Sequence, residues 1–426
     1  MEHLLFAGYL VLFAWLITKI KFFTRSGLTN SQLIILFLLK VLAGIFYGWI
    51  GLYYGQMAQM IDTWGYHTES LEEYRLLLNA PGDFFGSMFN SYESGYSNFF
   101  STQDSWWNDI KATSLIKLMA VFNVFSFGHY YVNVIFICFL TFFGPVAIYR
   151  VMQDVFPTRR IQVLLATFLI PSFLYWTSGL HKEGLIFTGL ALMIFHFYFG
   201  FKENRFPIHR VILIFLGFML VLILRNFLVI TVIPPLIAWM LSNFKKSRSL
   251  LIFAITTFIF VLLFFTARYI HPRLDFPQAT VNKQVEFSKL GGGSAVDVRP
   301  LEPHFPGFVE NAPQALALSI IRPYPSDVKH LLSLAAAIEI NLLLLFFIAF
   351  LFWRRNGFPL SPFLLFCLLL SFGILMMIGY TVNILGAIVR YRSIVLPFLV
   401  IPMAALIDWQ RIGKLLIGNI NNKNNV

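Results

Sequence analysis

The sequence predicts an all-α, polytopic transmembrane helical bundle of about eleven spans, with interfacial helices on its outer face. Three observations predict this class. Apolar residues make up 58% of the chain and charged residues only 12%, whereas soluble domains carry about 25% charged residues. Apolar runs of membrane-spanning length recur from end to end, and mean hydropathy is +0.73. Basic residues also return in every second connection between these runs, as in membrane proteins of fixed orientation.

The predicted spans are runs close to the roughly 20 apolar residues that a membrane helix needs. They cover residues 4–23, 32–54, 129–151, 161–178, 183–201, 208–224, 227–242, 249–270, 331–353, 360–380 and 384–407. The pair 208–224 and 227–242 is also compatible with a re-entrant hairpin. The first run lacks a small-residue cleavage site, so we expect a retained helix. Cys138 and Cys367 lie inside apolar runs and are expected to pack there, without a disulfide or zinc site.

The charges of the connections predict the orientation of the chain. Residues 57–113 carry eight acidic and two basic residues, which suits the outer side. By the positive-inside rule the N-terminus lies outside and the C-terminus lies in the cytoplasm. The same rule accounts for the net charge of +12 without a nucleic-acid partner. The basic residues of the inner connections and tail are Lys19, Lys21, Arg25, Arg150, Arg159, Arg160, Lys202, Arg205, Arg210, Lys245, Lys246, Arg248, Arg354, Arg355, Arg411 and Lys414.

Two outer segments interrupt this single membrane domain of residues 1–426. The first, 57–128, contains "SLIKLMAVFNVFSFG", which is too short to span and is typical of an amphipathic helix in the membrane interface. The second, 271–328, contains "GGGS" and several prolines. Loops of more than about 15 residues are usually functional or disordered. We expect this one to begin flexible and to end ordered.

Ionisable residues at the edge of the membrane are candidates for function because their burial is costly. Asp62, followed by Tyr66 and His67, comes directly after the second span. An acid in an outer loop needs no special role, but a carboxylate is also the simplest general base for a hydroxyl. In "TSGLHKEGLIF", His181, Lys182 and Glu183 join two spans. They form either a solvated turn or a site where Lys182 contacts phosphate and His181 moves a proton or holds a sugar.

Arginines supply the remaining candidates. Arg225 either marks a hairpin turn or faces a polar cavity, and the prolines of "RPYP" fix the chain around Arg322. Arg390 and Arg392, in "AIVRYRSIVLPF", point about 200° apart on a helix. We therefore expect one of them to face a cavity, where a guanidinium binds phosphate, and the other to snorkel to the interface; snorkelling of both is the alternative. Glu339 lies within a span and should pair with an arginine or line the cavity.

These features together resemble the GT-C class of membrane glycosyltransferases, which use polyprenyl-phosphate-linked sugars. Asp62 in "IDTWGYH" occupies the position of the acid that opens the first outer loop in that class, and residues 114–127 resemble its interfacial helix. The stretch "RYRSIVLPF" is similar to an Arg-Tyr…Pro stretch in its late spans. Polysaccharide polymerases that use lipid-linked repeat units share the long late outer loop. In this chain the acid follows the second span, and no second acid adjoins it.

The resemblance implies an inverting sugar transfer from a polyprenyl phosphate or diphosphate to an acceptor hydroxyl, at the outer face of a bacterial inner membrane. The partners would be a lipid-linked sugar donor, a glycan or lipid acceptor and membrane lipids, with no cofactor and no metal indicated. Catalytic roles would fall to Asp62 and His181. Trp64, Trp106 and Trp107 could stack on sugars. The substrate-binding candidates are His67, Lys182, Glu183, Arg225, Arg322, Arg390 and Arg392.

Three other functions remain open. A repeat-unit polymerase would use the same chemistry with a larger, lipid-linked acceptor. A transporter of lipid-linked saccharides would cleave nothing, and we would expect inverted repeats with broken helices, which the sequence does not show. A membrane acyltransferase would have to depend on His181 without a recognisable acid partner.

Overall fold

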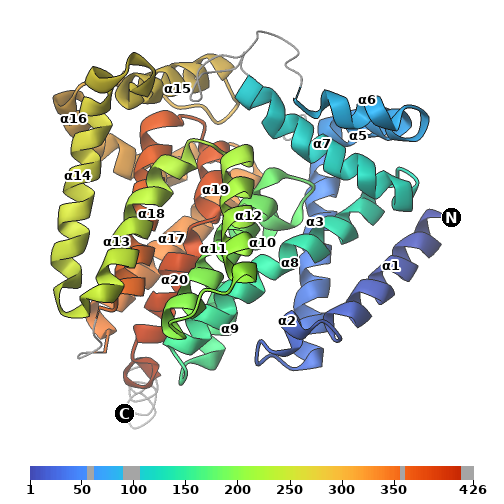
Figure 1. The fold of residues 1–426 in the computed structure, drawn as a ribbon, viewed down its shortest axis with the longest axis horizontal. Helices are drawn as coiled ribbons and strands as arrows, with labels where there is room; N and C mark the ends of the chain where they lie inside the picture. The colour runs from blue at the N-terminus through green and yellow to red at the C-terminus, as the bar shows by residue number, and fades with distance from the viewer. Residues whose placement is uncertain (55–61, 90–105, 356–359, 414–426) are drawn as a thin grey trace, which may run out of the picture.

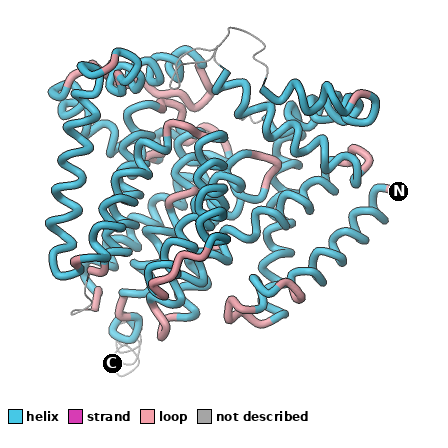
Figure 2. The backbone as a smooth tube through the Cα atoms, in the orientation of Figure 1, coloured by secondary structure: helices cyan, strands magenta, loops and turns pink. Residues whose placement is uncertain are grey.

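The computed structural model describes residues 1–54, 62–89, 106–355 and 360–413 (Figure 1). Within these ranges the chain is helical, and short loops join the helices (Figure 2). The β pairing in the described chain consists of two isolated bridges, Ala295 with Ile384 and Arg354 with Ile407. The predicted all-α class is therefore confirmed.

The helices follow one another in the order that the apolar runs predict. Each predicted run coincides with one helix or with two consecutive helices. The α-helices are α1 (Glu2–Ile17), α2 (Lys21–Thr24), α3 (Asn30–Tyr53), α5 (Asp62–Asn79), α6 (Pro81–Gly86), α7 (Trp106–Ser126), α8 (Tyr130–Val155), α9 (Arg160–Phe168), α10 (Pro171–Ser178), α11 (Lys182–Lys202), α12 (Ile208–Leu224), α13 (Leu228–Phe244), α14 (Ser249–Ile270), α15 (Phe276–Leu290), α16 (Phe305–Leu316), α17 (Leu331–Trp353), α18 (Pro362–Thr381), α19 (Leu385–Ser393) and α20 (Leu396–Leu406).

Length and composition divide these helices into three groups. In the described chain, six helices are long and apolar enough to cross a membrane: α3, α8, α11, α14 with its preceding turn, α17 and α18. Two pairs, α9 with α10 and α19 with α20, are long and apolar enough to cross a membrane only when each pair counts as one span. These pairs bend by 51° and 62° between their two helices. The helices α1, α12 and α13 are apolar but shorter. The structure thus supports an integral membrane protein with six to eight spans on these criteria.

The burial of the helices shows how the bundle is layered. In α8 and α11, 72% of the apolar 18-residue stretch that could cross a membrane is buried inside the protein. In α14 and α17 only 17% and 11% of that stretch are buried. Large side chains such as Phe142 of α8, Phe187 of α11 and Phe398 of α20 are fully enclosed and form part of one continuous core. The helices α8 and α11 therefore form the centre of the bundle, while α14 and α17 turn apolar side chains outward, as contact with lipid requires.

Two groups of helices cover one end of the bundle. In Figure 1, α5, α6 and α7 lie together at the upper right and α15 and α16 at the upper left, while the C-terminal helix α20 leads to the lower end. Lys117 of α7 links the three helices of the first group. Its Nζ donates to Glu73 of α5 at 2.8 Å and to the Phe84 carbonyl of α6 at 2.7 Å. The predicted helix at 114–127 exists as the second part of the longer α7.

The second outer segment is more regular than expected. The expectation that residues 271–328 begin as flexible chain is wrong, because α15 starts at Phe276. The carboxylate of Asp275 accepts from the Gln278 amide at 3.0 Å, and Pro277 follows in the first turn. Such caps satisfy the free N–H groups of a new helix and stabilise its start. The segment therefore forms part of the layer that covers this end of the bundle, beside α18.

Candidate functional site

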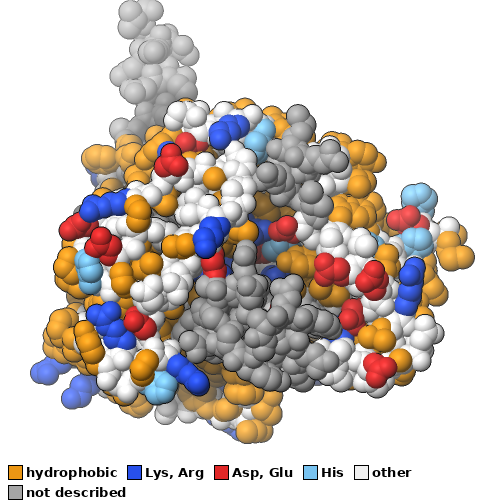
Figure 3. All heavy atoms as spheres, turned by 90° about the horizontal axis from the view of Figure 1, so that it is seen from above, with side chains coloured by type: hydrophobic (Ala, Val, Ile, Leu, Met, Phe, Trp, Pro, Cys, Tyr) orange, Lys and Arg blue, Asp and Glu red, His pale blue; other side chains and the backbone are white. Residues whose placement is uncertain are grey.

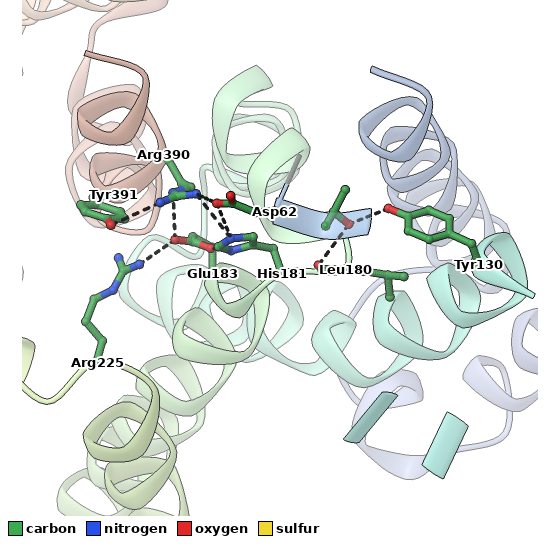
Figure 4. A network of polar contacts seen from close by, with 9 residues as sticks. Asp62, Tyr130, Leu180, His181, Glu183, Arg225, Arg390 and Tyr391 are labelled. Atoms are coloured by element: carbon green, nitrogen blue, oxygen red, sulfur yellow. Dashed lines mark hydrogen bonds and ion pairs between the residues drawn. The ribbon is translucent and has the colours of Figure 1, made fainter. Parts of the chain in front are cut away.

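The helices that cover this end of the bundle and the last bent helix pair meet in a cluster of ionisable side chains (Figure 4). Arg390 of α19 donates from Nη1 to Oδ2 of Asp62, the first residue of α5, at 3.1 Å. These residues are 328 positions apart in the chain. The Arg390 side chain is 18% exposed and that of Asp62 is 53% exposed, so the pair lies where the buried cluster reaches the surface.

Beneath this pair lies a buried carboxylate. Glu183 is fully enclosed, and its Oε1 accepts from Arg225 Nη2 at 2.7 Å and lies 3.6 Å from Arg390 Nε. Its Oε2 contacts Nδ1 of His181, whose Nε2 lies 3.9 Å from Asp62 Oδ2. An unpaired buried charge is very costly, so two arginines around one carboxylate explain why Glu183 can remain enclosed. His181 thus lies between the buried carboxylate and the exposed one.

The turn that carries His181 and Glu183 is built by glycines. A Cβ on Gly179 would lie 2.2 Å from the Tyr47 ring, and one on Gly184 would lie 2.5 Å from the Thr177 carbonyl oxygen. Only glycine allows approaches this close. The end of α10 is also held by Lys40 of α3, whose Nζ donates to the Thr177 carbonyl at 2.7 Å. Lys40 was not among the predicted site residues, although a lone lysine in the apolar run 32–54 is itself a signal.

The environment of Asp62 keeps its carboxylate ionised. Its contact with His181 and the charge of Arg390 hold the pKa of Asp62 well below its usual value, although partial burial opposes this. A carboxylate stabilised in this way is a weak base while Arg390 stays bound to it. Any ligand anion that draws Arg390 away would strengthen Asp62 as a base.

Further cations and aromatic rings complete the cluster. The Arg225 guanidinium lies over the Tyr391 ring at 3.9 Å, and Lys182 Nζ lies 5.0 Å from the centre of the Tyr66 ring. Within the described chain, the buried Nη1 of Arg225 has no hydrogen-bond partner. Of the two interpretations of Arg225, the geometry matches an arginine that faces a polar site. Tyr391 is a neighbour that the sequence did not single out.

Two predicted substrate-binding residues lie away from this cluster. His67 is buried against Trp64 and Tyr130, and this burial lowers its pKa to about 4, so it is neutral at physiological pH. Arg322 pairs with Asp327 at 3.2 Å. The structure therefore places neither residue in the cluster.

Arg392 shows why the two arginines of α19 differ. It is 2% exposed, and its Nη1 donates to the Arg322 carbonyl at 2.6 Å, so the expectation that it snorkels to the interface is wrong. The helical segment Ala317–Ile321 ends just before Arg322, and Arg392 donates to the carbonyl oxygens of Ser319 and Arg322 at this end. Only Arg390 of the pair faces the cluster.

Glu339 also has a different partner from those expected. Its carboxylate accepts from the Ser172 amide at 3.1 Å and from Ser172 Oγ at 2.8 Å, at the start of α10. The break between α9 and α10 exposes unpaired N–H groups, which attract an anion. Glu339 therefore stabilises this break. No arginine of the described chain lies within ion-pair distance of it, although its charge interacts with that of Arg392 from farther away.

The aromatic residues predicted to stack on sugars are Trp64, Trp106 and Trp107. Trp64 stacks on Tyr130 with ring centres 3.9 Å apart and donates to the Gly48 carbonyl at 2.9 Å, so its ring has a structural partner. The side chains of Trp106 and Trp107 lie outside the described residues. Trp176, which the sequence analysis did not select, lies 5.8 Å from the Arg390 guanidinium. Among the described residues, no group of three or more His, Cys, Asp or Glu side chains could hold a metal ion.

Comparisons of the chain with models of known protein families, with curated proteins and with solved structures find no match. The assignment of function therefore depends on the site itself: one half-exposed carboxylate, one buried carboxylate, a histidine between them, and the cations Arg390, Arg225 and Lys182.

Proposed function

We propose that this protein is an inverting glycosyltransferase of the bacterial inner membrane. It would transfer a sugar from a polyprenyl-phosphate or polyprenyl-diphosphate donor to an acceptor hydroxyl at the outer face, in cell-surface glycan synthesis. One observation carries the proposal: the contact between Asp62, near the start of the chain, and Arg390, near its end. This contact places a candidate base beside a candidate phosphate-binding group on the covered end of the bundle (Figure 4).

In the proposed reaction the donor phosphate takes the place of Asp62 on Arg390. The acceptor oxygen attacks the anomeric carbon, the bond from that carbon to the phosphate oxygen breaks, and the phosphate leaves with the electron pair. Asp62, released from Arg390, accepts the proton of the acceptor hydroxyl. Fixed positive groups at the leaving phosphate lower the barrier because they stabilise charge that develops in the transition state. Arg225 and Lys182 would add to this charge.

The charge pattern supports an outward-facing site. Seen from above in Figure 3, acidic side chains lie on both halves of the face, and those on the right-hand part, where α5, α6 and α7 lie, have few basic neighbours. We propose about eleven spans, with the short helices α1, α12 and α13 and both bent pairs counted as crossings. The N-terminus would be outside and the C-terminus in the cytoplasm, so that the basic connections face inward.

A repeat-unit polysaccharide polymerase is the second candidate. The observation that favours it is the helical order of α15 and α16, which give the outer face a folded surface on which a large acceptor could rest. A transporter of lipid-linked saccharides differs in kind, because the sugar–phosphate bond would stay intact.

The test is a reconstitution of the full chain in liposomes with a polyprenyl-diphosphate sugar and an acceptor glycan. We expect the sugar–phosphate bond to be cleaved, with free polyprenyl diphosphate as the second product. Arg390→Gln should weaken donor binding by about 10- to 100-fold, since hydrogen bonds to charged groups contribute about 1.5–3 kcal/mol.

Arg75→Gln is the matched control, because it removes the same charge from the outer helix α5 without touching the cluster. Movement of intact donor across the membrane, with no cleavage in any condition, would favour the transporter and contradict the proposal.

A further inference from the structure

A second group of cations lies beside the cluster. Helices α7, α13, α15 and α18 enclose a recess whose polar wall includes Lys111, Lys283, Thr280 and Thr381, and whose apolar wall includes Phe227. The recess continues the cluster along the chain: Arg225 belongs to the cluster, and the next two residues line the recess. Arg225 itself does not line the recess, but its charge acts on Lys111, so the cluster and the recess lie close together.

Lys111 is the cation in this recess whose charge is least balanced. In the described part of the chain, no carboxylate lies within 4.0 Å of its ammonium group, whereas Lys283 pairs with Glu286 at 2.9 Å. Burial, together with the charges of Lys283, Lys182 and Arg225, lowers the pKa of Lys111 to about 7, against a smaller opposing effect of Glu286. Such crowding of cations is unfavourable unless an anion relieves it.

The buried guanidinium of Arg225 points to the same conclusion. Its Nη2 is bound to Glu183, while its Nη1 is enclosed and has no partner within the described residues. A buried donor without a partner costs free energy that a ligand oxygen would recover. The cations of the cluster and recess are Arg390, Arg225, Lys182, Lys111 and Lys283, and the carboxylates are Asp62, Glu183 and Glu286.

We propose that the recess binds a second phosphate group, distinct from the one at Arg390. Lys111 and Lys283 would donate to its oxygens, and Nη1 of Arg225 would complete the contact from the side of the cluster. This inference rests on the proposed function and makes it more specific. Two sources share the chemistry: the second phosphate of a diphosphate donor, or the phosphate of a separate lipid-linked acceptor.

The experiment measures binding of two probes, polyprenyl monophosphate and polyprenyl diphosphate, to the full chain in lipid nanodiscs. The variants are Lys111→Gln and Lys283→Gln. If the second phosphate belongs to the donor, each variant should weaken diphosphate binding by about 10-fold or more and leave monophosphate binding at Arg390 unchanged. If it belongs to an acceptor, the wild type should bind two monophosphates per chain and the variants one.

The pH dependence supplies a second readout. Since the pKa of Lys111 is lowered to about 7, its charged fraction falls as the pH rises from 6 to 8, and binding at the recess should weaken over this range. The variant Lys111→Arg stays charged and should bind equally at pH 6 and pH 8 after correction for the titration of the probe itself. A merely structural lysine would not produce this difference.

Lys289→Gln is the matched control, because it removes a lysine from the exposed last turn of the same helix α15. Wild-type binding of both probes by Lys111→Gln and Lys283→Gln, at wild-type stoichiometry, would overturn the second-phosphate assignment. Arg390→Gln separates this outcome from failure of the proposed function. If Arg390→Gln also binds monophosphate normally, the proposed donor site is wrong. If Arg390→Gln loses monophosphate binding, the donor site stands and only the assignment of the recess is wrong.

Discussion

Replacement of Asp62 by asparagine should reduce the rate of sugar transfer by about 10²- to 10⁴-fold, the usual contribution of a general base. Asparagine has the same shape and can still accept from Arg390, but it cannot take the acceptor's proton. Because Asp62 competes with the donor phosphate for Arg390 at 3.1 Å, donor binding should be unchanged or tighter in the variant. Single-turnover transfer and donor binding, measured separately in nanodiscs, test both statements.

Asp83→Asn is the control for Asp62→Asn. Asp83 lies exposed in α6, in the same outer layer, and the same loss of charge there should leave transfer unchanged. A transfer rate for Asp62→Asn within about threefold of the wild type would exclude the role of general base, given the size of that contribution. Loss of transfer together with loss of donor binding would instead indicate that Asp62 holds the site in shape.

Glu183→Gln should cause the largest loss of stability among single changes in the cluster. The variant removes the negative charge that balances the buried guanidinium groups of Arg225 and Arg390. Removal of one partner from a buried ion pair typically costs about 3–5 kcal/mol of folding stability. His181 would also lose the carboxylate that orients its ring. We expect a clear fall in the melting temperature of the detergent-solubilised protein and loss of transfer.

Two comparisons make this prediction specific. Glu203→Gln breaks an exposed pair with Arg210 and should cost about 0–1 kcal/mol. The double variant Glu183→Gln/Arg225→Gln should be less destabilised than the sum of its single variants, because it removes both charges of one pair. Additive losses, or a Glu183→Gln protein as stable as the wild type, would show that the buried pair does not hold the cluster together.

The local sequence predicted the helices well because each depends on its own apolar run and on nearby breaks. The runs 32–54 and 129–151 appear as α3 and α8 with ends shifted by a few residues. The structure differs from the helices predicted from the sequence in two places. The cap provided by Asp275 made α15 helical where flexible chain was expected. The bends at α9–α10 and α19–α20 were not predicted, although Pro171 and Pro397 in the first turns of α10 and α20 are local signals for a break before them.

For the cluster, the sequence by itself determined the chemistry available: acids concentrated in residues 57–113, basic residues in alternate connections, and ionisable groups at the edges of the apolar runs. These follow from the cost of placing charge in lipid, which acts on each residue separately. Only the tertiary structure decided the partners. It brought Asp62 to Arg390, turned Arg392 toward backbone carbonyls and added Lys40 and Tyr391. Partner choice depends on contacts between helices far apart in the chain, and no local pattern records them.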